Sequence, residues 1–235
     1  FGPGFIDGKV GMFTQLAIEN YNTSLGRDIT DRRVIAESIR EVPELYASAI
    51  IPSFVGDFVD PSLPQEKPLQ AEKTFMPYRS VAEFMAERYH TSESFLIKLN
   101  GKSKAYGLRT GDTLKVPNIA PFRIEDISVG RMHKEDEQLS KHNIVIDTKN
   151  KQIFVYDPSQ PTIVIPGMAM VVSDEDQEPL GKMIAMFPTT TGGEQFIHHG
   201  VWKVVNCVEF PSWRYDKQFL ETGKRGTDVV DVAHG

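Results

Sequence analysis

The pattern of apolar and polar residues predicts two short helices at the start of the chain. After the turn-forming segment GPGFIDGKVG, apolar or small side chains recur at helical spacing. These positions are Phe13, Leu16, Ala17 and Tyr21. A second stripe, formed by Val34, Ile35, Ile39 and Val42, follows Thr30, which is expected to cap the helix. The region from 43 to 75 contains five prolines, which prevent a long helix and predict short extended pieces and a linker.

Residues 76–118 combine two predicted helices with a closing strand. Ser80 and Glu83 have the spacing of a capping box, and a helical stripe (Val81, Phe84, Met85, Tyr89) follows them. A second helix is expected to end at Asn100 and Gly101, because this pair tolerates left-handed backbone. The segment GDTLKVPN then predicts a turn and a strand that Pro117 terminates.

Residues after 118 alternate between charged and apolar stretches. The charged run RMHKEDEQLSKH within 119–142 predicts a solvated linker or helix face. The segment NIVIDTKNKQIFVYD, from Asn143 onward, predicts two alternating strands around a polar turn, and the apolar runs TIVIPGMAMVV and MIAMFPTTTGG follow. Residues 201–210 also predict a strand, with Cys207 on one face and Val208 on the other.

This order of elements indicates an α+β protein with several small parts. We expect a helical segment with a Pro-rich linker at 1–75, a module at 76–118 with a strand or turn, two helices and a closing strand (βααβ if the first piece is a strand), a linker at 119–142 and a β-rich region at 143–235. Hydrophobic residues make up 40% of the chain and charged residues 25%, as in folded globular proteins. The net charge of -6 lacks the positive surplus on which nucleic-acid binding depends, so nucleic acid is excluded as an expected partner.

Membrane and redox signals are sparse. No apolar run reaches the length of a transmembrane helix, and we expect that any export signal was either removed or never part of this sequence. The single cysteine, Cys207, allows no intrachain disulfide, which suits both cytosolic and periplasmic proteins. The composition gives no signal for an oligomeric state.

Cys207 and two histidines are the obvious candidates for chemistry. A catalytic cysteine needs a helix N-terminus or an imidazolium to lower its pKa, and a mid-strand position offers neither, so Cys207 is expected to be a structural thiol. Adjacent histidines on a strand point to opposite faces, and no ligand spacing accompanies His198 and His199. We therefore expect no metal, no cofactor and no catalytic residue within this chain.

The segment PSWRYD offers the best candidates for substrate contact. A Trp and a Tyr that follow a proline in a polar stretch are typical of a loop presenting flat apolar surface to a sugar or peptide. Trp213 and Tyr215 are therefore our expected substrate-binding residues. The alternative is that both rings anchor the loop to the core.

Residues 76–118, with two helices, Leu-Asn and then Gly-Asp-x-Leu-x-Val-Pro, resemble a lysin-motif (LysM) repeat, a small fold that binds N-acetylglucosamine-containing glycans. Residues 1–42 resemble a helical peptidoglycan-binding domain. In both cases the alternative is a module that only packs against its neighbours. We expect any glycan contact at the turns that flank the LysM-like helices, around Tyr78-Arg79 and Lys104–Leu108.

The stretch 143–193 is similar to the opening of the L,D-transpeptidase family. Asn143 begins the first strand, and Phe187, Pro188 and Gly192 occupy that family's aromatic-Pro-x-x-x-Gly pattern. The resemblance implies a cysteine acyl-enzyme that transfers peptidoglycan stem peptides, and a flap around Trp213 and Tyr215. The family's Ser-His-Gly-Cys motif does not occur, and His234 is not expected to replace the catalytic histidine.

The resemblance therefore implies a transferase of cell wall biogenesis in the cell envelope, periplasmic or secreted, with glycan strands and stem peptides as partners. Residues 1–235 alone are expected to be inactive, because the nucleophile of the family is not among them. One alternative is a non-enzymatic wall-binding or scaffold protein. Another, a hydrolase using Cys207 with His198 or His199, is disfavoured by the strand position of the thiol.

Overall fold

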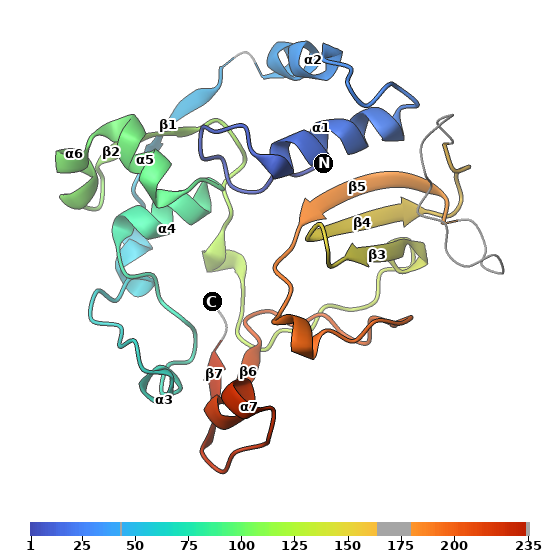
Figure 1. Cartoon of the computed structure of the whole chain (residues 1–235). Helices are drawn as coiled ribbons and strands as arrows, with labels where there is room; N and C mark the ends of the chain where they lie inside the picture. Colours follow the sequence, from blue (N-terminus) through green and yellow to red (C-terminus); the bar gives the residue numbers. More distant parts are fainter. Residues whose placement is uncertain (43, 164–179, 234–235) are drawn as a thin grey trace. The chain divides into compact units, whose positions relative to one another are not determined.

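The computed structural model describes residues 1–42, 44–163 and 180–233, and its helices and antiparallel strands confirm the α+β class (Figure 1). The chain forms two compact units, each built from two segments. The first comprises Phe1–Glu44 and Glu135–Lys203, and the second Leu45–Lys134 and Val204–Gly235. Each unit thus joins segments that are distant in sequence, whereas the sequence-based division was strictly consecutive. The apolar run TIVIPGMAMVV lies largely outside the described residues.

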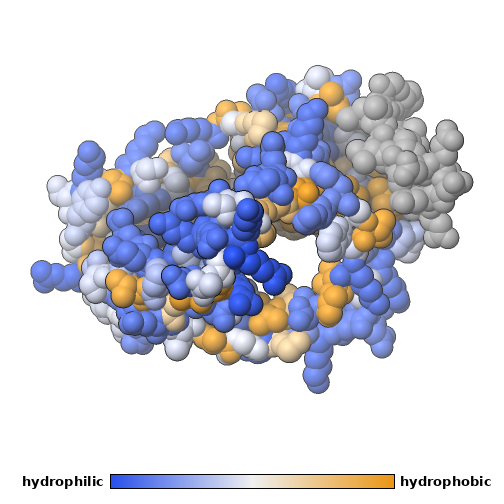
Figure 2. All heavy atoms as spheres, turned by 60° about the horizontal axis from the view of Figure 1, so that its bottom comes forward, coloured by the Kyte–Doolittle hydropathy of each residue, from blue (hydrophilic) through white to orange (hydrophobic). Residues whose placement is uncertain are grey.

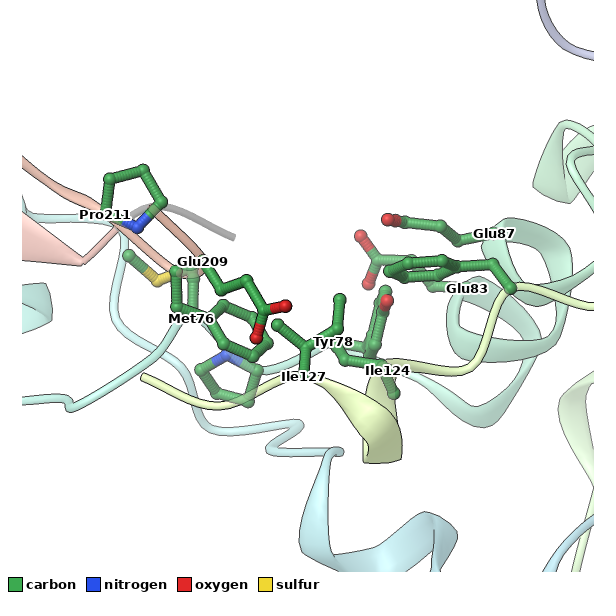
Figure 3. Close-up of a pocket in the computed structure, with 11 residues that line it drawn as sticks. Met76, Tyr78, Glu83, Glu87, Ile124, Ile127, Glu209 and Pro211 are labelled. Atoms are coloured by element: carbon green, nitrogen blue, oxygen red, sulfur yellow. The ribbon is translucent and has the colours of Figure 1, made fainter. Parts of the chain in front are cut away.

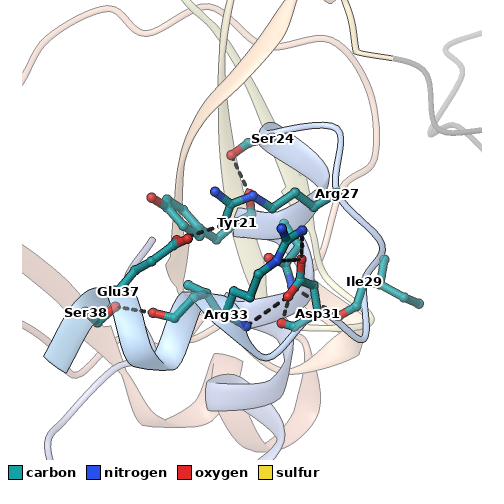
Figure 4. A network of polar contacts seen from close by, with 10 residues as sticks. Tyr21, Ser24, Arg27, Ile29, Asp31, Arg33, Glu37 and Ser38 are labelled. Carbon is teal, nitrogen blue, oxygen red and sulfur yellow. Dashed lines mark hydrogen bonds and ion pairs between the residues drawn. The ribbon is translucent and has the colours of Figure 1, made fainter. Parts of the chain in front are cut away.

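The first unit begins with a helical hairpin. Its helices are α1 (Met12–Ser24) and α2 (Arg33–Glu41), close to the predicted positions. The buried Asn22 amide donates to the Ile29 and Asp31 carbonyl oxygens at 3.3 and 2.9 Å. An ion pair between Arg27 and Glu37, with 2.7 Å between nitrogen and oxygen, joins the start of the connection to α2 (Figure 4). These contacts fix the turn between two helices that are too short to be stable alone.

The predicted cap of α2 is wrong. Thr30 donates its hydroxyl to the Asp28 carboxylate at 2.5 Å, and its backbone N–H donates to the same oxygen. The helix begins only at Arg33, and the Asp31 carboxylate accepts the Arg33 N–H at 2.9 Å. The Arg33 hydrogen bonds lower the pKa of Asp31 to about 2. A local turn therefore engages the hydroxyl that the sequence pattern assigned to the cap.

The sheet of the first unit is antiparallel in the order β3 (Asn143–Asp147), β4 (Gln152–Asp157) and β5 (Lys182–Pro188). The β3–β4 hairpin confirms the predicted pair of strands around a polar turn. Helix α1 covers one face, where Phe154, Tyr156 and Met186 are buried with Ala17 (Figure 1). A short 3-10 helix, Glu194–Phe196, follows the sheet, and another, Leu139–Lys141, precedes it.

The second unit contains a βααβ element. Strand β1 (Tyr46–Ile50) pairs antiparallel with β2 (Thr113–Pro117) over five residues, and the helices α4 (Val81–Arg88) and α5 (Glu93–Asn100) lie between them in sequence. A single-turn helix, α6 (Lys102–Tyr106), leads into β2. Strand β1 comes from the region expected to be a linker with short extended pieces, so the element draws its first strand from before residue 76.

Two local signals set the helix boundaries as predicted. The Ser80 hydroxyl accepts the Glu83 N–H at 3.0 Å, and the Glu83 carboxylate accepts the Arg79 N–H at 2.6 Å. Helix α5 ends at Asn100 because Gly101 adopts a positive φ of 85°. The Asn100 amide then donates to the Lys115 carbonyl and accepts the Lys115 N–H, both at 2.8 Å. One side chain thus fastens the end of the helix to β2.

The core of this unit is densely aromatic. Phe84, Met85, Leu96, Leu114 and Val116 are almost completely buried, with exposed fractions of 1% or less. The connection between β1 and α4 adds the 3-10 helix Ser53–Asp57 and the short helix α3 (Lys67–Gln70). From that connection Phe54, Phe58 and Tyr78 bring their rings to within 6.5 Å of the Phe84 ring. The Pro-rich stretch therefore completes the core.

The stretch after β2 is largely exposed, as expected for residues 119–142, and holds the 3-10 helix Ile124–Asp126. Arg88 of α4 pairs with Glu125 through two nitrogen–oxygen distances of 2.8 and 2.9 Å. This bidentate ion pair, in which both side chains are mostly buried, fixes the segment after β2 to α4.

The C-terminal part corrects two predictions. Residues 201–206 form no strand within the described chain, and Val201, Trp202, Val204 and Val205 are 72–91% exposed. The segment predicted to be a loop is instead β6 (Ser212–Asp216), which pairs with β7 (Val229–Ala233) across the helix α7 (Lys217–Thr222). An alternating apolar run becomes a strand only where another segment supplies hydrogen-bond partners.

Apolar residues also reach the surface elsewhere, as patches among polar side chains (Figure 2). No helix within the described residues is long and apolar enough to cross a membrane.

Candidate functional site

Strand β6 brings the two predicted substrate-binding residues together. Trp213 and Tyr215 lie two residues apart, so both side chains emerge on one face of the strand. Their ring centroids are 5.4 Å apart in an edge-to-face arrangement, and both residues are half-buried. The Lys67 ammonium lies 6.0 Å from the centre of the Trp213 ring. The pair combines some exposed aromatic surface with contacts inside its own unit.

The end of β6 is held by Asp216. Its carboxylate accepts the backbone N–H groups of Phe219 and Gly226 at 2.9 and 2.8 Å, which caps α7 and closes the turn toward β7. These backbone hydrogen bonds lower the pKa of Asp216. The aromatic pair therefore belongs to a hairpin whose turn is fixed by these hydrogen bonds.

Cys207 is exposed, so the prediction of a buried structural thiol on a strand face is wrong. Its carbonyl accepts the His133 N–H at 2.9 Å, where residues 207–209 run beside 130–133. No hydrogen bond reaches the thiol from the described residues, and no helix begins at Cys207. A helix N-terminus, one of the features that activate a catalytic thiol, is therefore missing from its described surroundings.

The two histidines of the HHG segment are exposed in an irregular stretch after the 3-10 helix Glu194–Phe196. Across the ranges 1–42, 44–163 and 180–233, no three His, Cys, Asp or Glu side chains gather closely enough to hold a metal ion. His234 lies outside the described residues.

A pocket in the second unit is a feature that the sequence patterns missed. It has a volume of about 400 Å³. Residues from three separate segments line it, namely Met76, Pro77, Tyr78, Glu83, Glu87, Phe122, Ile124, Ile127, Glu209, Phe210 and Pro211 (Figure 3). Its walls are mainly apolar, and three carboxylates and one phenol are the polar exceptions. Small-molecule sites commonly have this size and this mixture.

The carboxylates fall into two groups. Glu83 and Glu87, one helical turn apart on α4, extend toward each other and toward the Tyr78 hydroxyl, while Glu209 enters from the other side (Figure 3). Burial of the Glu87 carboxylate, and next the negative charge of Glu83, raise the pKa of Glu87. Burial also raises the pKa of Tyr78, and the neighbouring Glu87 adds to the effect. The α4 side of the pocket therefore disfavours further negative charge.

Glu209 is neutralised by its neighbours. It accepts hydrogen bonds from the Arg131 guanidinium at 2.7 Å and the Ser128 N–H at 2.7 Å, and the His133 Nε2 lies 2.8 Å away. The Arg131 hydrogen bond is the main reason that the pKa of Glu209 falls to about 2. The next residue, Phe210, holds a positive φ of 43°, which is costly for a bulky side chain. This strained position borders the pocket.

One sequence signal pointed to this site. Glutamates at i and i+4 on a helix repel each other, so a pattern such as E83-x-x-x-E87 needs an explanation from tertiary structure. The remaining walls become neighbours only when residues 122–127 and 209–211 fold against α4.

Comparison with known proteins adds no relative: no protein-family model matches this chain, and no curated protein matches it.

Proposed function

We propose that this chain belongs to a peptidoglycan-remodelling L,D-transpeptidase and that its βααβ element binds the glycan strand. The observation that carries the proposal is the βααβ element itself, with a two-stranded antiparallel sheet whose second strand is fastened to the end of α5 by Asn100. This arrangement agrees with the LysM-like sequence pattern of residues 76–118. The protein would act in the cell envelope, with glycan strands and stem peptides as its partners.

The glycan surface is best sought in the connection between α5 and β2. Tyr106 is 73% exposed at the end of α6, and the connection is hydrogen-bonded to Ile51, the residue directly after β1. Ile51 donates to the Asp112 carbonyl at 2.9 Å and accepts the Gly111 N–H at 3.0 Å. An exposed ring on a fixed loop suits stacking against the apolar face of a sugar. Tyr78, in contrast, is buried in the core and offers its ring to no large ligand at that turn.

The first unit supports the enzymatic part of the proposal. The β3–β4–β5 sheet carries the Asn143 and Phe187-Pro188 positions on which the resemblance rests. Its face opposite α1 presents Ile144, Ile146 and Phe187 at 49–58% exposure. A sheet with two apolar faces suits the interior of a larger β domain. Trp213 and Tyr215 are the proposed contacts to substrate.

Glycan binding is tested with the full chain of 235 residues and purified peptidoglycan. We expect the chain to co-sediment at low and moderate salt, because stacking and hydrogen bonds depend weakly on ionic strength. Tyr106→Ala should weaken binding about tenfold, as expected for the loss of one aromatic contact. Phe5→Ala, which removes another exposed ring, is the matched control and should bind normally. A folded chain that stays in the supernatant contradicts the binding proposal.

Catalysis is tested with the native protein incubated with disaccharide-tetrapeptide, with products followed by mass spectrometry. Release of the terminal D-residue together with a cross-linked product supports the transpeptidase. Glycan binding without any such product would instead support the scaffold alternative. Cross-linking by residues 1–235 that is abolished in Cys207→Ser would restore Cys207 as a nucleophile.

A further inference from the structure

The pocket of the second unit has the shape and lining of a site for a small organic molecule. Its volume of about 400 Å³ lies within the range of ligand sites, and Phe122, Ile124 and Ile127 form much of its apolar wall. Phe122 is anchored by its N–H, which donates to the Arg88 carbonyl at 2.7 Å, and Ile124 is buried in the core. These walls are therefore part of the folded unit and do not depend on a ligand to form.

The polar part of the pocket carries negative charge that the described residues leave without an ion pair. Glu83 and Glu87 form no ion pair within the described ranges. The two nearest arginines in sequence are used elsewhere: Arg88 pairs with Glu125, and the Arg79 guanidinium donates to the Leu63 carbonyl at 2.6 Å. His90 contributes only a weaker favourable charge toward Glu87. Two like charges one turn apart, facing an apolar hollow, favour a positively charged partner.

We propose that this pocket binds an organic cation, with a primary ammonium group between the Glu83 and Glu87 carboxylates and an apolar body against Phe122, Ile124 and Ile127. The Tyr78 hydroxyl faces the same space and can accept a further hydrogen bond from the ammonium. An ammonium has three donors, which matches two carboxylates and one phenol. This proposal is independent of the transpeptidase and glycan proposals.

The same lining disfavours other ligand classes. An anion would meet two carboxylates and be repelled. A hard metal ion would require six or more oxygen ligands, whereas most of this wall is hydrocarbon. Glu209 adds little to such a set, because Arg131 and His133 already occupy its carboxylate.

The probe is 2-phenylethylammonium, with 2-phenylethanol as its neutral analogue, titrated calorimetrically into the full chain at neutral pH and low salt. We expect the ammonium to bind at least about tenfold more tightly than the alcohol, because charge-assisted hydrogen bonds are about twice as strong as neutral ones. Equal affinities, or no binding of the ammonium, would overturn the proposal.

Isosteric variants locate the site. Glu87→Gln should weaken ammonium binding about tenfold and leave the alcohol unaffected, and Glu83→Gln should act similarly while its amide oxygen still accepts the Arg79 N–H. Glu72→Gln makes the same charge change at an exposed position outside the pocket and should have no effect.

A steric variant tests the apolar part of the site. Ile127→Trp should prevent both probes from binding, because the larger indole ring fills the pocket beside the apolar wall. Circular dichroism verifies that each variant is folded. Glu83 takes part in the cap of α4, whereas Glu87 does not, so the Glu87→Gln result decides the outcome if Glu83→Gln unfolds. Equal losses in Glu72→Gln and Glu87→Gln would refute the assignment.

Discussion

The two units bury their apolar residues in different ways. In the second unit, α4 and α5 close over β1 and β2, and the central side chains Phe84, Leu96 and Leu114 have almost no exposed surface. In the first unit, α1 covers one face of the β3–β4–β5 sheet, but Ile144 and Ile146 on the other face remain more than half exposed. The same apolar residue types therefore form a closed core in one unit and a solvent-exposed face in the other.

The largest expected effect comes from substitutions that separate these two environments. Leu114→Ala should lower the free energy of unfolding by about 2–5 kcal/mol, because it leaves a cavity in a closed core. Ile146→Ala should change it by about 0.5 kcal/mol or less, since that side chain already contacts solvent. Urea denaturation of both variants measures the contrast. A loss for Ile146→Ala as large as that for Leu114→Ala would show that the open face is covered in solution.

A smaller effect is expected for the polar clamp of the βααβ element. Asn100→Ala removes two hydrogen bonds to Lys115 and should destabilise the protein by about 1–2 kcal/mol, at about 1 kcal/mol for each bond. Asn150→Ala in the β3–β4 turn removes one exposed contact to Asp147 and should cost about 0.5 kcal/mol. Chemical denaturation compares the two, and an equal cost would contradict a special role for the Asn100 clamp.

A pH-dependent effect is expected at Glu209. Its folded pKa of about 2 lies below the ordinary 4.5, so its stabilising contribution is fully present above pH 4.5 and is lost as the pH falls toward 2. Glu209→Gln should therefore be less stable than the parent at pH 7, and the difference should shrink between pH 4.5 and pH 2. Urea midpoints measured across this range test the sign. A difference that is independent of pH would assign the effect to packing alone.

The smallest effect on stability is expected at Cys207. Because the residue is exposed, Cys207→Ser should leave the unfolding midpoint unchanged, and iodoacetamide should label the folded protein at nearly the rate seen in denaturant. Mass spectrometry follows the labelling. Strong protection in the folded state would restore the structural-thiol prediction, which the exposed position of Cys207 contradicts.

Local signals made several elements predictable. The capping box at Ser80 marks the start of α4, and the Asn100-Gly101 pair marks the end of α5. Both signals were readable from the sequence because each depends on hydrogen bonds and backbone angles within a few residues. The alternating residues of 143–157 predicted the β3–β4 hairpin, since its strands are joined by a short turn and need no distant partner. The α+β class followed from these elements.

Other features depended on contacts between distant segments. Strand β1 pairs with β2, and the helices α4 and α5 lie between the two strands in sequence. Strand β6 forms only because β7 supplies its hydrogen bonds. Residues 201–206 have an equally apolar pattern but no such partner within the described chain.

Local sequence therefore specified the boundaries of α4 and α5, the β3–β4 hairpin and the charge pattern, because these depend on neighbouring residues. Contacts between distant segments made β1 and β6 strands, left residues 201–206 without a strand, and set which apolar side chains were buried. It also assembled the pocket, whose carboxylates on α4 meet apolar walls from residues 122–127 and 209–211. The physical reason is that strand pairing and cavity formation need partners that sequence spacing does not specify.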